Sequence, residues 1–161
     1  MHAAANVVQN SERVHDVRVR RTPALLLVAF VFLVAVAPAS AAFKFKAFVT
    51  PSGNIRCGAS GDTATGKDFG LRCDITHHTW RAPKRSKPCI EGDYGSSLGM
   101  TKRSGAKFIC VSDAIDPVKK VKYGTIFRFG PFRCSIRTAG VRCSNAARHG
   151  WFVSRQRVKR F

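Results

Sequence analysis

The sequence predicts an all-β fold, namely a small disulfide-stapled sandwich or partly open barrel of short antiparallel strands. Three observations favour this fold class. Six cysteines occur in a chain of 161 residues, two pairs of cysteine-containing segments have the mirror symmetry of β-hairpins, and no long stretch shows helical periodicity. The hydrophobic fraction, 45%, is that of a globular protein rather than of a disordered basic tail.

Residues 1–42 have the pattern of a secretory signal peptide. Basic residues ending at Arg21 precede an uncharged run over residues 24–37, which is too short to cross a bilayer as a helix. Small residues follow this run, and we place cleavage near Ala41 or Ala42. The alternative is an uncleaved segment that anchors the protein. Residues 43–161 are then a single disulfide-bonded β domain, secreted to the extracellular space or associated with the cell envelope.

An even number of cysteines in a small exported domain predicts a disulfide framework. If residues 137–140 form a hairpin loop, Cys134 lies directly opposite Cys143. The same arithmetic places Cys57 opposite Cys73 in an earlier hairpin. Opposed residues of antiparallel strands are close enough to form a disulfide, so both pairs are predicted to be bridged.

The remaining cysteines, Cys89 and Cys110, are predicted to pair with each other. No Cys-x-x-Cys pair occurs, so the cysteines do not point to a metal site, and no cofactor is expected. In the earlier hairpin Arg56 lies opposite Asp74, and we expect an ion pair there on the face away from the disulfide.

The rest of the domain is expected to contain further strands, about seven or eight in all. They are placed at residues 43–46, 107–111, 125–129 and 150–158. Glycines favour loops in two other segments, the tip of the first hairpin at residues 58–70 and the stretch at residues 91–105.

Several motifs occur in an order that resembles a known family. They are Pro51-Ser52-Gly53-Asn54-Ile55-Arg56-Cys57, Leu71-Arg72-Cys73-Asp74, Trp80, Gly130-Pro131-Phe132-Arg133-Cys134, Gly140-Val141-Arg142-Cys143 and His149-Gly150-Trp151-Phe152-Val153-Ser154-Arg155. The combination is similar to a family of small secreted actinobacterial proteins classed only as a domain of unknown function. The resemblance spans residues 48–161 and implies export and a single domain with these cysteines. It implies no activity, and the present chain departs from the family in its unusual basicity.

The charge is large and positive. The formal net charge is +19 and the isoelectric point is near 10.8, and charge of this size acts at long range on anionic partners. Candidate contacts to a polyanion fall into three groups. They are the loop residues Lys84, Arg85 and Lys87, the cluster Lys119, Lys120 and Lys122, and the hairpin residues Arg56, Arg72, Arg133 and Arg142, which face away from their disulfides. A further basic cluster consists of Arg155, Arg157, Lys159 and Arg160.

These features favour a cationic binding or structural domain that contacts anionic cell-envelope polymers or lipid headgroups. Nucleic acid is a weaker candidate, because no known recognition motif is present. We expect a monomer with no obligate protein partner. An alternative interpretation of the charge is that it only keeps the surface solvated.

No catalytic constellation is recognisable, so no catalytic residue is assigned and the domain is predicted not to be an enzyme. The competing function is that of a small secreted hydrolase in which His149 acts with a distant acid, Ser or Thr.

Overall fold

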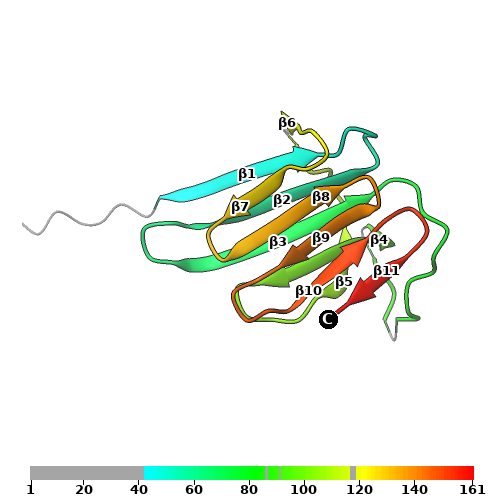
Figure 1. Cartoon of the computed structure of the whole chain (residues 1–161). Coiled ribbons are helices and arrows are strands. Elements are labelled where there is room, and N and C mark those ends of the chain that lie inside the picture. Colours follow the sequence, from blue (N-terminus) through cyan, green and yellow to red (C-terminus); the bar gives the residue numbers. More distant parts are fainter. Residues whose placement is uncertain (1–41, 86, 91, 117–118) are drawn as a thin grey trace, which may run out of the picture. The chain divides into compact units, whose positions relative to one another are not determined.

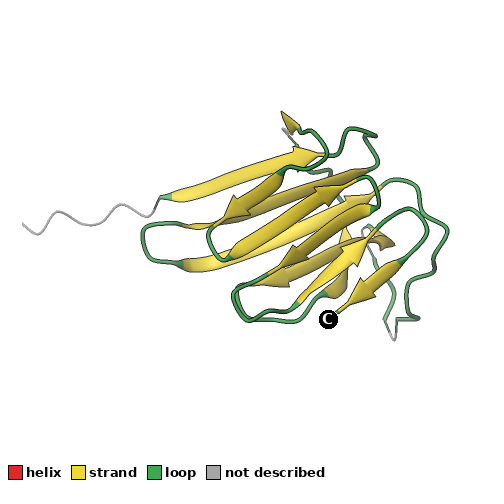
Figure 2. Ribbon diagram, in the orientation of Figure 1, coloured by secondary structure: helices red, strands yellow, loops and turns green. Residues whose placement is uncertain are grey.

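The computed structural model describes residues 42–85, 87–90, 92–116 and 119–161. These residues form eleven strands and no helix (Figures 1 and 2), and so none of them belongs to a helix that could span a membrane. The strands make two sheets that do not close into a barrel. The predicted all-β, disulfide-stapled fold is confirmed as a sandwich. The predicted signal peptide lies outside the described residues.

Six strands form the first sheet, sheet A, in the order β5-β4-β3-β2-β1-β6. Their bounds are β1 Phe43–Val49, β2 Ile55–Asp62, β3 Lys67–Ile75, β4 Asp93–Thr101, β5 Lys107–Val111 and β6 Lys119–Lys120. Neighbours pair antiparallel except β6, a two-residue edge strand that pairs parallel with the end of β1.

Five antiparallel strands form the second sheet, sheet B, in the order β11-β10-β9-β8-β7. Their bounds are β7 Ile126–Phe129, β8 Phe132–Arg137, β9 Gly140–Ser144, β10 Gly150–Val153 and β11 Val158–Arg160. Figure 1 shows the two sets of strands as two layers: β1 to β5 of sheet A are cyan to yellow-green with β6 in yellow, and sheet B runs from gold (β7) to red (β11).

All three predicted disulfides are confirmed. In sheet A Cys57 pairs in register with Cys73, and in sheet B Cys134 pairs with Cys143, as the hairpin arithmetic requires. The α-carbons are 4.0 Å apart in both of these bridges and 5.9 Å apart in the third, between Cys89 and Cys110.

The two hairpin disulfides meet in the middle of the sandwich. The sulfur atoms of Cys57, Cys73 and Cys143 lie within 4.8 Å of one another, although the first two belong to sheet A and the third to sheet B. The four hairpin cysteines have no exposed surface. Because each sulfur is bonded to another sulfur, this cluster is a packing contact between two cross-links and not a set of free thiolate ligands.

Apolar side chains surround this contact on the inner faces of both sheets. Because side chains alternate along a strand, every second residue of β2, β3, β8 and β9 points inward. The buried residues that pack together include Phe48, Ile55, Leu71, Ile75, Leu98, Phe127, Phe132, Ile136, Val141, Trp151 and Val153. The core therefore takes one face of each sheet and leaves the opposite faces to solvent.

Two segments predicted as loops are strands. The expected loop at residues 58–70 is mostly β2 and β3, which continue to a turn over residues 63–66. Likewise residues 93–101 of the expected loop at 91–105 form β4, which contains a register irregularity between Tyr94 and Leu98. The loop prediction was wrong because these glycines allow close packing within strands rather than turns. A Cβ on Gly58, for example, would lie 2.8 Å from the ring of Phe45.

Other expectations need smaller corrections. The single last strand expected at residues 150–158 is two strands, β10 and β11, which pair with each other. The loop of the second hairpin is shorter than expected, because Arg137 still pairs with Gly140, but the register is unchanged. The ion pair between Arg56 and Asp74 is also wrong: the two residues are opposite, but Asp74 pairs with Arg72 on its own strand.

We predict that the two hairpin disulfides stabilise the fold more than the third does. If loop length alone determined the stabilisation, Cys89–Cys110 would stabilise the fold most, because its cysteines are 21 residues apart in sequence and those of the other two bridges are 16 and 9 residues apart. Replacing that pair, in which Cys89 is half-buried and Cys110 exposed, by Ala should cost about 3 kcal/mol of unfolding free energy. Replacing either hairpin pair by Ala should cost about 4–5 kcal/mol, because buried packing is lost as well. Urea denaturation checks the order, and a larger cost for Cys89–Cys110 would contradict it.

Candidate functional site

The outer face of sheet B is rich in exposed basic residues. We call it the arginine face, and define it by residues that come from all five strands or stack on them. They are Arg128 on β7, Arg133 and Arg137 on β8, Arg142 on β9, Lys159 on β11 and Arg157, which lies over the β10 residue Phe152. All six are exposed.

The disulfide of this sheet determines which residues point outward. Because Cys134 and Cys143 face the core, the residues beside them, Arg133 and Arg142, must face solvent. The register also sets Arg128 directly opposite Arg133 on the neighbouring strand. Like charges in opposed positions of a sheet repel each other and are destabilising. The pair therefore costs stability unless an anion neutralises it.

Within the described residues, no carboxylate forms a salt bridge with a cation of this face. The sequence contains twelve Lys and Arg after Asp116, and no Asp or Glu. Salt bridges within the described part of the chain involve a single basic residue, Arg72, which lies on the other sheet. The cations of the arginine face are consequently free to bind external anions.

Aromatic rings hold two of the guanidinium groups in place. The guanidinium carbon of Arg142 lies 3.9 Å from the centre of the Phe161 ring, and that of Arg157 lies 4.8 Å from the centre of the Phe152 ring. Stacking on a ring leaves the N–H groups at the guanidinium edge able to donate to a ligand. Because these side chains are already ordered, less conformational entropy is lost when they bind.

Arginine predominates over lysine here, five residues to one by the definition above. A guanidinium group donates two parallel hydrogen bonds to a phosphate, sulfate or carboxylate, whereas an ammonium group acts as a point charge. The arrangement can therefore bind oxyanions in a row across the strands.

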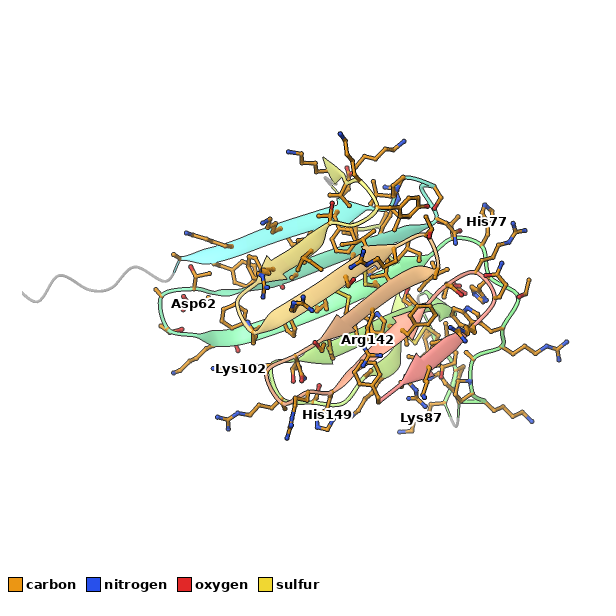
Figure 3. All side chains as sticks on the ribbon, in the orientation of Figure 1. Asp62, His77, Lys87, Lys102, Arg142 and His149 are labelled. Atoms are coloured by element: carbon orange, nitrogen blue, oxygen red, sulfur yellow. A yellow bond between two sulfur atoms is a disulfide. The ribbon has the colours of Figure 1, made fainter. Side chains whose placement is uncertain are left out.

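Of the predicted contact residues, only Arg133 and Arg142 lie on the arginine face. The loop residues Lys84, Arg85 and Lys87 are exposed in the connection between β3 and β4. Figure 3 shows Lys87 in that connection, away from Arg142 on sheet B. Arg85 stacks on the ring of Tyr94 at 5.0 Å and contacts the sulfur of Cys110.

The other predicted residues lie on sheet A or beside it. Lys119 and Lys120 are β6, the exposed edge strand, and Lys122 is exposed just after it. Arg56 and Arg72 face away from the Cys57–Cys73 disulfide, as the hairpin register predicts. They are therefore on the outer face of sheet A, on the opposite side of the sandwich from the arginine face.

Arg72 is occupied by two carboxylates. Its Nε donates to Asp74 at 2.8 Å, and its Nη1 donates to Asp113 at 2.6 Å. The hydrogen bond and the charge of Arg72 lower the pKa of Asp113 below its ordinary value. The pair ties the segment after β5 to the outer face of sheet A, and it makes Arg72 a structural residue rather than a free cation.

Sequence reasoning missed Arg128 and Arg137. It grouped Arg157 and Lys159 with Arg155 and Arg160 as a separate basic cluster rather than with Arg133 and Arg142. A signal was present: no acidic residue follows Asp116, and outward positions can be counted from Cys134 and Cys143 once their pairing is assumed. The position of Arg128 could not be counted in this way, because it depends on a third strand.

His149 lies in the exposed turn between β9 and β10, and Figure 3 shows it at the edge of the domain. Its backbone N–H donates to the Oδ1 atom of Asn145 at 3.0 Å, which makes it part of the turn. Among the described residues its ring makes no hydrogen bond to an acid, Ser or Thr. The geometry offers nothing in support of the hydrolase alternative.

Comparison with known proteins identifies one family. A family of unknown function, DUF6636, matches residues 26–161. No curated protein and no solved structure matches the chain. The resemblance to a domain of unknown function is thereby confirmed, while its secreted and actinobacterial character stays a prediction.

We predict that Arg133→Thr stabilises the protein. Removing one member of the opposed Arg128–Arg133 pair relieves repulsion and should raise the unfolding free energy by about 0.5–1 kcal/mol at low salt. The gain should shrink at about 1 M salt, where the repulsion is screened. Arg133→Lys keeps the charge and serves as the control. Urea denaturation at two salt concentrations measures the effect, and a gain that does not depend on salt would refute the repulsion.

We also predict a pH-dependent role for Asp113. Since its pKa is lower in the folded protein than in the unfolded chain, its ionised form stabilises the fold above about pH 4. That contribution is lost as the pH falls through the folded-state value. Asp113→Asn should therefore lower the melting temperature at pH 7, and the difference from the wild type should shrink as the pH is lowered below about 4. The pKa of Asp62 is also lowered, chiefly by the hydrogen bond from the Thr65 hydroxyl. Asp62 is present in both the wild type and the variant, so its effect cancels in the difference between their melting temperatures. A difference that stays constant with pH would contradict the role.

Proposed function

The chain belongs to the DUF6636 family of unknown function, and we propose that it is a binding domain whose arginine face holds a linear, phosphate-bearing polymer of the cell envelope. One observation carries the proposal: six exposed cations share one sheet face that has no acidic residue to neutralise them. A surface that only needed solubility would not require like charges in opposed positions, because these destabilise the sheet.

The shape of the face favours an extended ligand. Neighbouring strands of a sheet are about 4.8 Å apart, and outward residues on one strand recur about every 6.8 Å. Cations on β7, β8, β9 and β11 therefore form rows that cross the strands. A flexible chain with regularly spaced charges can contact several of them at once, and each contact releases counterions.

The chemistry of arginine favours phosphate groups on that chain. Guanidinium groups bind phosphate oxygens in pairs, and those of Arg142 and Arg157 are ordered by their aromatic partners. Phosphate-bearing polymers of the envelope supply such groups in a row. The location supports the same class of partner, since three disulfides are consistent with an extracellular or secreted protein.

The proposal predicts where charge reversal abolishes binding. In Arg128→Glu/Arg133→Glu/Arg142→Glu, three attractive contacts become repulsive, so affinity for linear polyphosphate should fall about hundredfold, or about 3 kcal/mol. The matched control is Lys84→Glu/Arg85→Glu/Lys87→Glu, which changes the net charge equally on another surface. Its affinity should fall less than about fivefold. Isothermal titration at low salt measures both.

Binding measurements at several salt concentrations and with anionic liposomes complete this experiment. For the wild type, log affinity should fall linearly with log salt concentration, with a slope of about 0.7 for each phosphate bound, and the slope should be smaller for the arginine-face variant. Equal losses in the two triple variants would show that only net charge matters and would refute a defined face. Binding to anionic liposomes but not to polyphosphate would refute a polymer partner.

A further inference from the structure

The outer face of sheet A, unlike the arginine face, contains a groove with a volume of about 640 Å³. Arg72 of β3 lies in its floor between Gly58 and Gly99, with its guanidinium bonded to Asp74 and Asp113. The other outward positions of the three adjacent strands are small, so the rest of the floor is backbone. These positions are Gly58 and Ser60 on β2, Gly70 on β3 and Gly99 on β4. The flat floor lies on the far side of the strands that carry the Cys57–Cys73 disulfide.

Apolar side chains form the walls. Phe45 projects from β1 over Gly58 together with Ile115, a buried residue of the segment that follows β5. On the other side Ile109 of β5 covers Gly99, where an added Cβ would lie 2.9 Å from its Cδ1 atom. Phe45 is 48% exposed although it lies against this groove, which leaves one aromatic wall available to a ligand.

Polar groups of opposite sign lie at the two ends of the groove. Lys107 begins β5, next to the hairpin residues Thr101 and Ser104, whereas Asp113 and Asp116 follow the end of β5. Asp113 is already paired with Arg72. No salt bridge to Lys107 occurs among the described residues, so its ammonium group is free to bind an anion at its end.

The hairpin that carries the free lysine is held in place from sheet B. The Asn145 side-chain amide donates to the carbonyl oxygens of Thr101 and Ser104, both at 2.9 Å. Asn145 is itself buried. The polar end of the groove is thereby fixed relative to the apolar walls, which is the preorganisation that ligand binding requires.

We propose that this groove binds a free single-chain amphiphile, with the alkyl chain on the glycine floor between Phe45 and Ile109 and an anionic head group at Lys107. A concave, mainly apolar site of 300–1,000 Å³ with a few polar groups is typical for a small ligand. At the opposite end Asp113 is neutralised by Arg72, and the carboxylate of Asp116 disfavours an anionic head group, so the charges favour one direction of the ligand.

This site does not depend on the proposed function. It lies on the other sheet, uses none of the residues of the arginine face, and takes a ligand that has an apolar body. Binding of a polymer and binding of an amphiphile can therefore be lost separately, and either proposal can fail alone.

Gly70 offers a direct test. A Cβ at this position would meet nothing closer than the Ser60 Oγ at 3.9 Å, and the residue does not have a positive φ, so a larger side chain fits and fills the groove. Gly70→Leu should lower the affinity for palmitate, used below its micelle-forming concentration, at least about tenfold. Gly105→Leu is the matched control: this glycine also has open space and does not line the groove, and its variant should bind like the wild type.

Lys107 tests the direction of the ligand. Lys107→Gln should weaken palmitate binding about fivefold and leave binding of the uncharged alcohol hexadecanol unchanged. Equal palmitate affinity in Gly70→Leu and the wild type would overturn the groove, and equal losses for palmitate and hexadecanol in Lys107→Gln would overturn the head-group assignment.

Two further outcomes would also overturn the proposal. One is binding to lipid vesicles without binding to palmitate, because the occupant would then be a membrane rather than a free amphiphile. The other is a wild-type dimer in sedimentation that Gly70→Leu converts to a monomer, because the occupant would then be a second copy of the chain. Melting temperatures of all variants close to that of the wild type ensure that these comparisons are made between folded proteins.

Discussion

The contact between two disulfides at the centre of the sandwich is the constraint on which the rest of the structure depends. Cys57–Cys73 and Cys134–Cys143 each join neighbouring strands in register, and their sulfur atoms meet across the two sheets. A register slip of one residue would turn a whole strand over and remove its cysteine from this contact. The bridges thus determine the inner and outer faces of both hairpins, and the core packs around them.

The two outer faces follow from this alternation and differ in chemistry. In sheet B the residues beside the cysteines are arginines, and they form a cationic surface with an unfavourable Arg128–Arg133 pair. In sheet A many outward residues are glycine or serine, and of the outward arginines Arg56 and Arg72, Arg72 is neutralised by two carboxylates. One face therefore suits an anionic polymer, and the other suits a small apolar ligand.

The local part of this architecture could be predicted from the sequence, and the non-local part could not. The spacing of the cysteines in the sequence was enough to predict the disulfides Cys57–Cys73 and Cys134–Cys143, because each pair belongs to one hairpin. Gly58 and Gly99 suggested loops, since their role beneath Phe45 and Ile109 depends on side chains from other strands. Arg133 and Arg142 could be placed on the outer face from their own hairpin. The neighbouring cations on β7 and β11 could not, because their positions depend on strands outside that hairpin. The groove escaped prediction because residues 93–101 were expected to be a loop.

Titrating arginine side chains directly tests the central claim that the disulfide-determined alternation builds one anion-binding face. NMR of the Nε–Hε groups during addition of polyphosphate follows each guanidinium separately. Arg128, Arg133 and Arg142 should shift together and saturate at one concentration, while Arg72, already bonded to Asp74 and Asp113, should not move. Shifts confined to Arg85, or spread equally over all exposed arginines, would contradict the account.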